Sequence, residues 1–198
     1  KNRIASEGID FVSLSFDPQE HASDDLTILE NVGTLPHVVH SANAIYGADL
    51  GVHISPIALR RRFNPYATNP SDLFIAEDKK ADPRQSTVFC ALWTFGALIG
   101  ATRRGAHSVT FFQTAGKQGI LSSHGDPYPV YDVLKQFTRF QGKSVTVVDS
   151  SDPLSVEGMV IDGKLLALVN YSTKEMKVRL DDRDFKLGPQ EMTFAPLN

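Results

Sequence analysis

The sequence predicts an α/β protein: the C-terminal portion of a (β/α)8 TIM barrel, about strands six to eight, followed by a small antiparallel β domain. Apolar β-rich segments alternate with helical ones, which is typical of βαβ units and a parallel sheet. The loops after the strands are long and polar, as at the catalytic face of a barrel. Closely spaced strands then replace this pattern, so we expect a barrel part at residues 1–142 and an all-β domain at 143–198.

Three segments are expected to form parallel strands. Residues 9–16 alternate between apolar and small polar side chains, and residues 51–58 and 108–114 are rich in β-branched and aromatic residues. Pro56 has no N–H for a ladder hydrogen bond, so the second strand should end or bulge there. Three βα units cannot close a barrel of eight, and we therefore expect about five further units upstream.

Helix signals follow each of these strands. Thr27 and Glu30 have the spacing of a capping box, in which both side chains satisfy free N–H groups at a helix start. Pro36 interrupts that helix and is expected to open a second one. Residues 82–104 begin with Asp-Pro, a good N-cap and first-turn pair, and are apolar almost all round, which predicts a buried helix. Pro129 opens another helix with one apolar face.

The last part of the chain, residues 143–198, is predicted to form β-hairpins. Asp162-Gly163 lies between two apolar β-rich runs and is the strongest short hairpin signal. Residues 145–148, 177–180 and 192–194 add further short strands. These segments predict a small antiparallel domain.

Composition excludes several classes of protein. The net charge of -3 argues against nucleic-acid or membrane-surface binding, which favour a basic excess. No apolar run reaches the ~18 residues of a membrane span and no signal peptide is recognisable, so we expect a cytoplasmic protein. Cys90 is the single cysteine and lies in an apolar run, which predicts buried packing. Nothing in the sequence demands a metal or a cofactor.

The loop after the first expected strand carries the first candidate site. His21 has Asp24 three residues away, an arrangement that suits a general base or acid held by a carboxylate. It also suits half of a metal site. A third interpretation is structural, with Asp24 or Asp25 as the N-cap of the following helix.

Two further loops offer groups that suit substrate binding. Arg60 and Arg62 share a face of any extended segment, and a guanidinium fork there could bind a carboxylate or polarise a carbonyl. A solvated basic stretch is the alternative. Ser55 begins this loop but lacks the G-x-S-x-G context of a nucleophile. Gln113 and Lys117 follow the third expected strand and could hydrogen-bond a sugar hydroxyl or carbonyl.

Three segments together resemble the D-apionate lactonase family. They are PQEHASD at residues 18–24, SPIALRRRFNP at 55–65 and TFFQTAG at 110–116, with a further likeness at 82–85. The resemblance implies a barrel related to glycoside hydrolases that opens D-apionolactone to D-apionate. The family pattern has an acidic residue at the position of Gln113, and a glutamine cannot serve there as a carboxylate base or nucleophile.

Lactone hydrolysis is therefore the expected activity, with a small-molecule sugar lactone as substrate and with no activity from these residues alone. His21 is expected to act as base or acid and Asp24 to orient it. Substrate contacts are expected from Asp17, Ser55, Arg60, Arg62, Gln113 and Lys117. Two alternatives remain open: a retaining glycoside hydrolase, which needs two carboxyl groups about one bond, and a non-catalytic carbohydrate-binding remnant.

Overall fold

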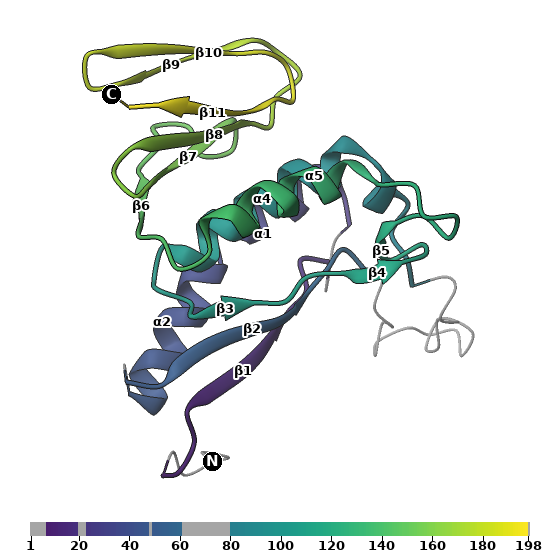
Figure 1. Ribbon diagram of the computed structural model, residues 1–198, viewed down its shortest axis with the longest axis vertical. Helices are drawn as coiled ribbons and strands as arrows, with labels where there is room; N and C mark the ends of the chain where they lie inside the picture. The colour runs from purple at the N-terminus through teal and green to yellow at the C-terminus, as the bar shows by residue number, and fades with distance from the viewer. Residues whose placement is uncertain (1–6, 20–22, 48, 61–79, 198) are drawn as a thin grey trace.

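A three-stranded parallel sheet organises the first part of the chain. The computed structural model describes residues 7–19, 23–47, 49–60 and 80–197. The strands β1 (Phe11–Phe16), β2 (Gly51–Ile57) and β3 (Ser108–Val109) lie in the order β1-β2-β3 (Figure 1). Their register shifts between Leu14 and Phe16, opposite Pro56, so the irregularity predicted for the second strand is confirmed. Sequential parallel order is that of a TIM-barrel wall.

Helices connect the strands and cover one face of this sheet. Helices α1 (Asp25–Val32) and α2 (Leu35–Tyr46) join β1 to β2, and α4 (Val88–Thr102) joins β2 to β3. Helix α5 (Pro129–Phe137) follows the last strand and continues into a 3-10 turn, η3 (Thr138–Phe140). The βα alternation predicted from the sequence is confirmed.

The starts of two helices refine the prediction. The N-cap of α1 is Asp24, as the structural interpretation of this loop expected, and not Thr27 of the capping box, since the Asp24 side chain accepts a hydrogen bond from the Thr27 N–H. Asp82 caps a 3-10 turn, η2 (Pro83–Ser86), and not the long helix itself. Thr87 then takes an extended conformation before α4 begins. A β-branched residue in this conformation separates the turn from the helix.

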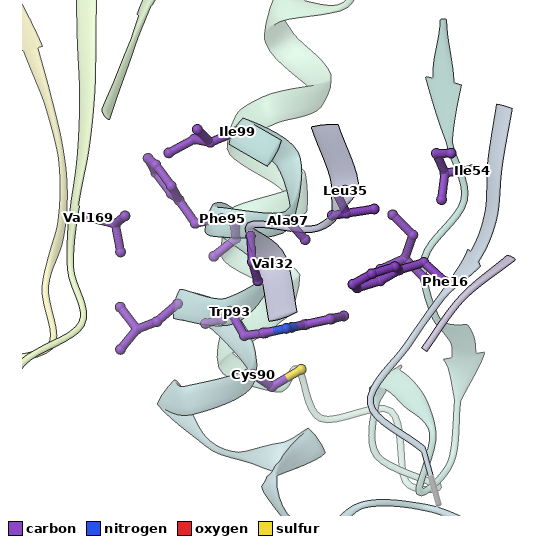
Figure 2. Close-up of a cluster of buried hydrophobic side chains, with 14 of the residues drawn as sticks. Phe16, Val32, Leu35, Ile54, Cys90, Trp93, Phe95, Ala97, Ile99 and Val169 are labelled. Atoms are coloured by element: carbon purple, nitrogen blue, oxygen red, sulfur yellow. The ribbon is translucent and has the colours of Figure 1, made fainter. Parts of the chain in front are cut away.

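Helix α4 is the centre of the hydrophobic core. It lies between the parallel sheet, represented by Phe16 and Ile54, and the C-terminal sheet, represented by Val169 (Figure 2). Trp93 and Phe95 are fully buried, as expected for a helix that is apolar on all sides. Cys90 is buried as predicted, and burial raises the pKa of its thiol to about 12. This cysteine is a packing residue.

The segment predicted as a third strand, residues 108–114, is shorter than expected. Phe111 and Phe112 are both half-buried and lie with their rings 5.8 Å apart, so the alternation of a strand stops there. Gln113 belongs to a separate short strand, β4 (Gln113–Ala115), which pairs with β5 (Gly119–Leu121). Its predicted position at the end of a barrel strand is wrong.

The C-terminal region folds into a four-stranded antiparallel sheet and a hairpin, in the orders β11-β8-β7-β6 and β10-β9. The strands are β6 (Val145–Val148), β7 (Val156–Ile161), β8 (Leu165–Asn170), β9 (Met176–Leu180), β10 (Arg183–Leu187) and β11 (Met192–Pro196). Asp162 and Gly163 have φ values of 56° and 68°, the left-handed conformation typical of tight hairpin turns, which confirms this predicted turn.

Strand β10 was absent from the prediction. Its sequence RDFKL alternates charged and apolar residues, but only Leu187 is buried and Phe185 half-buried. Leu187 packs with Leu166 and Leu168 of β8 between the hairpin and the larger sheet. Strand β10 is thus stabilised by packing against another sheet. The short sequence pattern of β10 alone does not predict that packing.

Candidate functional site

Asp17 and Arg60 meet where β1 and β2 end. Arg60 Nε lies 3.4 Å from Asp17 Oδ2, and the Gln19 N–H donates to Asp17 Oδ1 at 2.9 Å. The Asp17 side chain is 4% exposed and that of Arg60 33%, so the carboxylate is buried and the guanidinium reaches solvent. Carboxyl ends of parallel strands form the catalytic face of α/β barrels. The structure therefore brings together two of the predicted site residues at this face.

A buried clamp lies beside this pair. Arg84 binds Asp82 at two points, Nε to Oδ1 at 2.8 Å and Nη2 to Oδ2 at 2.7 Å. Gln19 Nε2 donates to Asp82 Oδ2 at 2.6 Å. Burial alone would raise the pKa of Asp82, but the hydrogen bonds from Arg84 and Gln19 outweigh it and hold that pKa below its ordinary value. Asp82 is thus a buried, charged anchor.

The clamp also holds the start of α1. Arg84 Nη1 donates to Asp25 Oδ1 at 2.6 Å, and the guanidinium lies over the Phe89 ring at 5.3 Å. Hydrogen bonds to Asp82, followed by that to Asp25, raise the pKa of Arg84, so its charge is permanent. The loop after β1 and the turn before α4 are therefore tied together behind Asp17.

Sequence reasoning missed this clamp. Asp82 was predicted only as a helix cap, and Gln19 was given no role. Gln19 and Asp82 are 63 residues apart, and no local spacing predicts such a pair. The available signal was Arg84 two residues after Asp82, a spacing that permits a bidentate contact across a tight turn.

Asp24 caps the N-terminus of α1. Its Oδ1 accepts from the Thr27 N–H at 2.9 Å and its Oδ2 from the Thr27 hydroxyl at 2.7 Å. These hydrogen bonds, the backbone one first, lower the pKa of Asp24. The predicted capping role of this side chain is confirmed. His21 and Arg62 lie outside the described residues.

The remaining predicted residues occupy different places. Ser55 lies on β2, on the face that the helices leave open, whereas Gln113 is exposed on β4. Lys117 follows β4 and lines a pocket of 270 Å³ together with Asp82 and Tyr128. Lys117 therefore shares a pocket with Asp82 of the clamp.

No metal centre stands out in the part of the chain that the structure describes. Among residues 7–19, 23–47, 49–60 and 80–197, no three histidine, cysteine or acidic side chains gather closely enough to hold an ion. None of the described helices combines the length and hydropathy that crossing a bilayer requires.

Solved structures share the fold of this chain. A GH39 β-xylosidase from Caulobacter crescentus superposes with a TM-score of 0.52 at 12% identity, over 96% of this chain and 49% of that one. A monomeric β-xylosidase from Caulobacter crescentus CB15 gives a TM-score of 0.49 at 12% identity, over 87% and 35%. The first of these likenesses supports an α/β, TIM-barrel-like architecture.

Sequence comparison gives the family. The chain is 27% identical over 187 residues to the D-apionate lactonase of Brucella anthropi, and the match covers 89% of this chain. It spans 30% of the length of that relative. The family model described as D-apionate lactonase, TIM barrel domain, matches residues 1–142. This chain therefore belongs to the D-apionate lactonase TIM barrel family.

Proposed function

We propose that this chain is the C-terminal part of a longer TIM-barrel enzyme that hydrolyses a sugar-acid lactone of the D-apionolactone type. The observation that carries the proposal is the Asp17–Arg60 pair, which lies at the ends of two parallel strands in a member of a lactonase family. The exposed edge of a buried ion pair is suited to a small polar substrate. The proposed domains are residues 1–142 and 143–198.

Lactone opening needs a polarised carbonyl and an activated water. Water adds to the carbonyl carbon, the ring C–O bond breaks, and a carboxylate and a hydroxyl result. Negative charge develops on the carbonyl oxygen in between, and fixed cationic donors lower the energy of that state. Arg60 has its Nε directed at the buried Asp17 carboxylate, which holds the fork in place. Its terminal nitrogens are proposed to bind the carbonyl oxygen and then the product carboxylate.

His21 is the proposed base for the attacking water and the acid for the leaving ring oxygen, because imidazole exchanges protons near neutral pH. Asp24 is proposed to orient it through the chain rather than by contact, since its two oxygens are already bonded to Thr27. Arg62 is proposed to assist in binding the carboxylate. These roles rest on the chemistry of the side chains and the family to which the chain belongs.

The remaining substrate contacts are proposed for groups on the neighbouring loops. Lys117 lines a polar pocket beside Asp82 and can donate to a sugar hydroxyl or carbonyl. Gln113 and Ser55 are proposed to bind further hydroxyls. A glutamine at position 113 can hydrogen-bond a hydroxyl but cannot act as an acid or a base.

Glycoside hydrolysis is the second candidate, because the fold resembles that of a GH39 β-xylosidase. A single experiment separates the two. The longest reading frame that contains this chain is expressed, and base uptake at constant pH is followed with D-apionolactone beside the release of nitrophenol from aryl glycosides. Base uptake without nitrophenol release is the expected result, and the reverse pattern would replace lactonase by glycosidase.

A His21→Ala variant in the same assay tests the proposed base. General base catalysis contributes at least ~100-fold to a rate, so a loss of that size in kcat is expected. His37→Ala is the matched control, because His37 is exposed on α2. Near-normal turnover by His21→Ala would remove that residue from the proposed role.

A further inference from the structure

The open face of the parallel sheet is polar. Val52, Ile54 and Ile57 of β2 are buried under the helices, and the side chains between them point to the opposite face. The register aligns this opposite face across the three strands. Toward the carboxyl ends of the strands, the residues on this face are Ser13, Ser15, His53, Ser55, Ser108 and Thr110. Barrel interiors are more commonly filled by bulky branched residues, so a polar face at this place suggests that it binds a polar ligand.

His53 joins two hydroxyls on this face. Its Nδ1 lies 2.5 Å from Ser108 Oγ, and its Nε2 lies 3.2 Å from Thr110 Oγ1. The ring of His53 therefore bridges positions 108 and 110 of the neighbouring strand. A neutral imidazole has one donor and one acceptor nitrogen, so one hydroxyl donates to the ring while the other accepts from it.

Backbone hydrogen bonds fix Thr110 beside Ser55. The Thr110 N–H donates to the Ile54 carbonyl at 2.9 Å, and the Ile57 N–H donates to the Thr110 carbonyl at 2.9 Å. Thr110 is thus held on both sides of the Ser55–Pro56 step. In the sheet register Phe16 lies opposite Ile57, and Asp17 comes next along the chain. Thr110, beside Ser55, therefore lies about three residues before the level of Asp17 along the sheet.

We infer that His53, Ser108 and Thr110 form the polar floor of the sugar-binding site, in which His53 is a positioning residue that sets the direction of the Thr110 hydroxyl toward a hydroxyl of the substrate. This inference rests on the proposed function for the identity of the ligand. Thr110 is exposed, whereas Ser108 is half-buried. Thr110 lies nearer the carboxyl ends of the strands than Ser108, so a ligand bound at that end would contact Thr110 while Ser108 holds the His53 ring.

The enzymatic test compares Thr110→Val with Thr110→Ser. Valine keeps the shape of threonine and removes the hydroxyl, whereas serine keeps the hydroxyl. Losing one hydrogen bond to substrate is expected to raise KM about fivefold with little change in kcat, because a hydrogen bond contributes on the order of 1 kcal/mol. Thr110→Ser is expected to keep the wild-type KM, and His37→Gln is the control on the outer surface of α2.

A double variant tests whether His53 acts through Thr110. His53→Ala alone should raise KM, and His53→Ala combined with Thr110→Val should have the KM of Thr110→Val alone. Residues that act in one chain of hydrogen bonds are not additive, whereas independent contacts multiply. An unchanged KM in Thr110→Val, or multiplied effects in the double variant, would overturn the inference.

The nitrogen NMR spectrum of the His53 ring gives a readout apart from turnover. Ser108→Ala is expected to move the Nδ1 resonance of His53 and to leave that of His37 unchanged. Added D-apionate is expected to move the His53 resonances as well. If the wild type opens no lactone, the proposed function is overturned. In that case a His53 shift with D-apionate would support the floor as a sugar-acid site, and no shift would overturn it too.

Discussion

The phenol of Tyr171 donates a hydrogen bond to Glu157 Oε2 at 2.7 Å, against Gly96 in the middle of α4. A methyl group added at Gly96 would lie 2.3 Å from the Tyr171 oxygen. This contact joins the antiparallel sheet to the helix that carries the core of the barrel part. The glycine is therefore required by the packing of the antiparallel sheet against α4.

Gly96→Ala is expected to destabilise the protein by about 1–3 kcal/mol, the usual cost of forcing extra atoms into a packed core. Alanine is the better helix former by about 1 kcal/mol, so the sign of the change reports the clash. Adding Tyr171→Phe removes the nearest atom and should recover part of the loss. Urea unfolding of the wild type, Gly96→Ala and the double variant measures this. A more stable Gly96→Ala protein would contradict the close approach.

Glu157 makes stability depend on pH. Burial raises the pKa of Glu157 above its ordinary value of 4.5, and the hydrogen bond from Tyr171 offsets this only in part. The unfolded chain then loses the proton at lower pH than the folded one, so the free energy of unfolding falls as pH rises from about 4.5 to the folded pKa. Glu157→Gln is expected to abolish this fall and to be the more stable protein at neutral pH.

The control for that experiment is Glu175→Gln, an exposed acid paired with Lys186. Its unfolding free energy should follow the wild-type pH curve. Parallel curves for wild type and Glu157→Gln between pH 4 and 8 would show that Glu157 is not buried as the structure has it.

The clamp predicts different effects for the two carboxylates bound to Arg84. Asp82→Asn leaves the guanidinium without its buried partner and is expected to cost about 3 kcal/mol, because the Asp82 side chain is 2% exposed. Asp25→Asn is the matched control. The Asp25 side chain is 68% exposed, and its removal should cost less than about 1 kcal/mol. Equal losses in chemical denaturation would refute a clamp centred on Asp82.

The clamp also has an expected pH dependence. The pKa of Asp82 is lowered on folding, so its contribution to stability is present above the ordinary value of 3.8 and is lost as pH falls below it. The stability difference between wild type and Asp82→Asn should therefore shrink in acid. A difference that grows as pH falls would mean that the folded protein prefers Asp82 protonated.

Asp24 can be tested as a cap and as a positioning group. Asp24→Ser keeps a side-chain oxygen for the Thr27 N–H and should keep the melting temperature, whereas Asp24→Ala should lower it. If the cap positions the loop that carries His21, turnover should follow the same order. Lost turnover in Asp24→Ser at an unchanged melting temperature would show a direct role for the carboxylate.

The sequence predicted those parts of the fold that depend on neighbouring residues. Alternation gave the parallel strands, the apolar run around Trp93 gave the buried helix, and Asp162-Gly163 gave the hairpin. The length of the third strand was wrong, because Phe111 and Phe112 turn together toward the core and break the alternation.

The site was harder to predict because its contacts are distant in the chain. Gln19 meets Asp82 across 63 residues, and His53 meets Ser108 across 55. Asp17 and Arg60 were each predicted as site residues, although their pairing was not, and both lie in loops after strands that parallel topology brings to one edge. Distant partners of this kind depend on the register between strands, which no single segment contains.

The most direct test of the proposed lactonase is a comparison of wild type and Arg60→Ala in the longest chain that contains these residues. Base uptake with D-apionolactone is followed at constant pH, with unfolding measured in parallel. The expected result is lactone opening by the wild type and a loss of about 100-fold in kcat/KM for Arg60→Ala, measured at a temperature at which both proteins are folded, the usual effect of removing one donor to a developing oxyanion. No opening by the wild type, or equal rates for both proteins, would contradict the account.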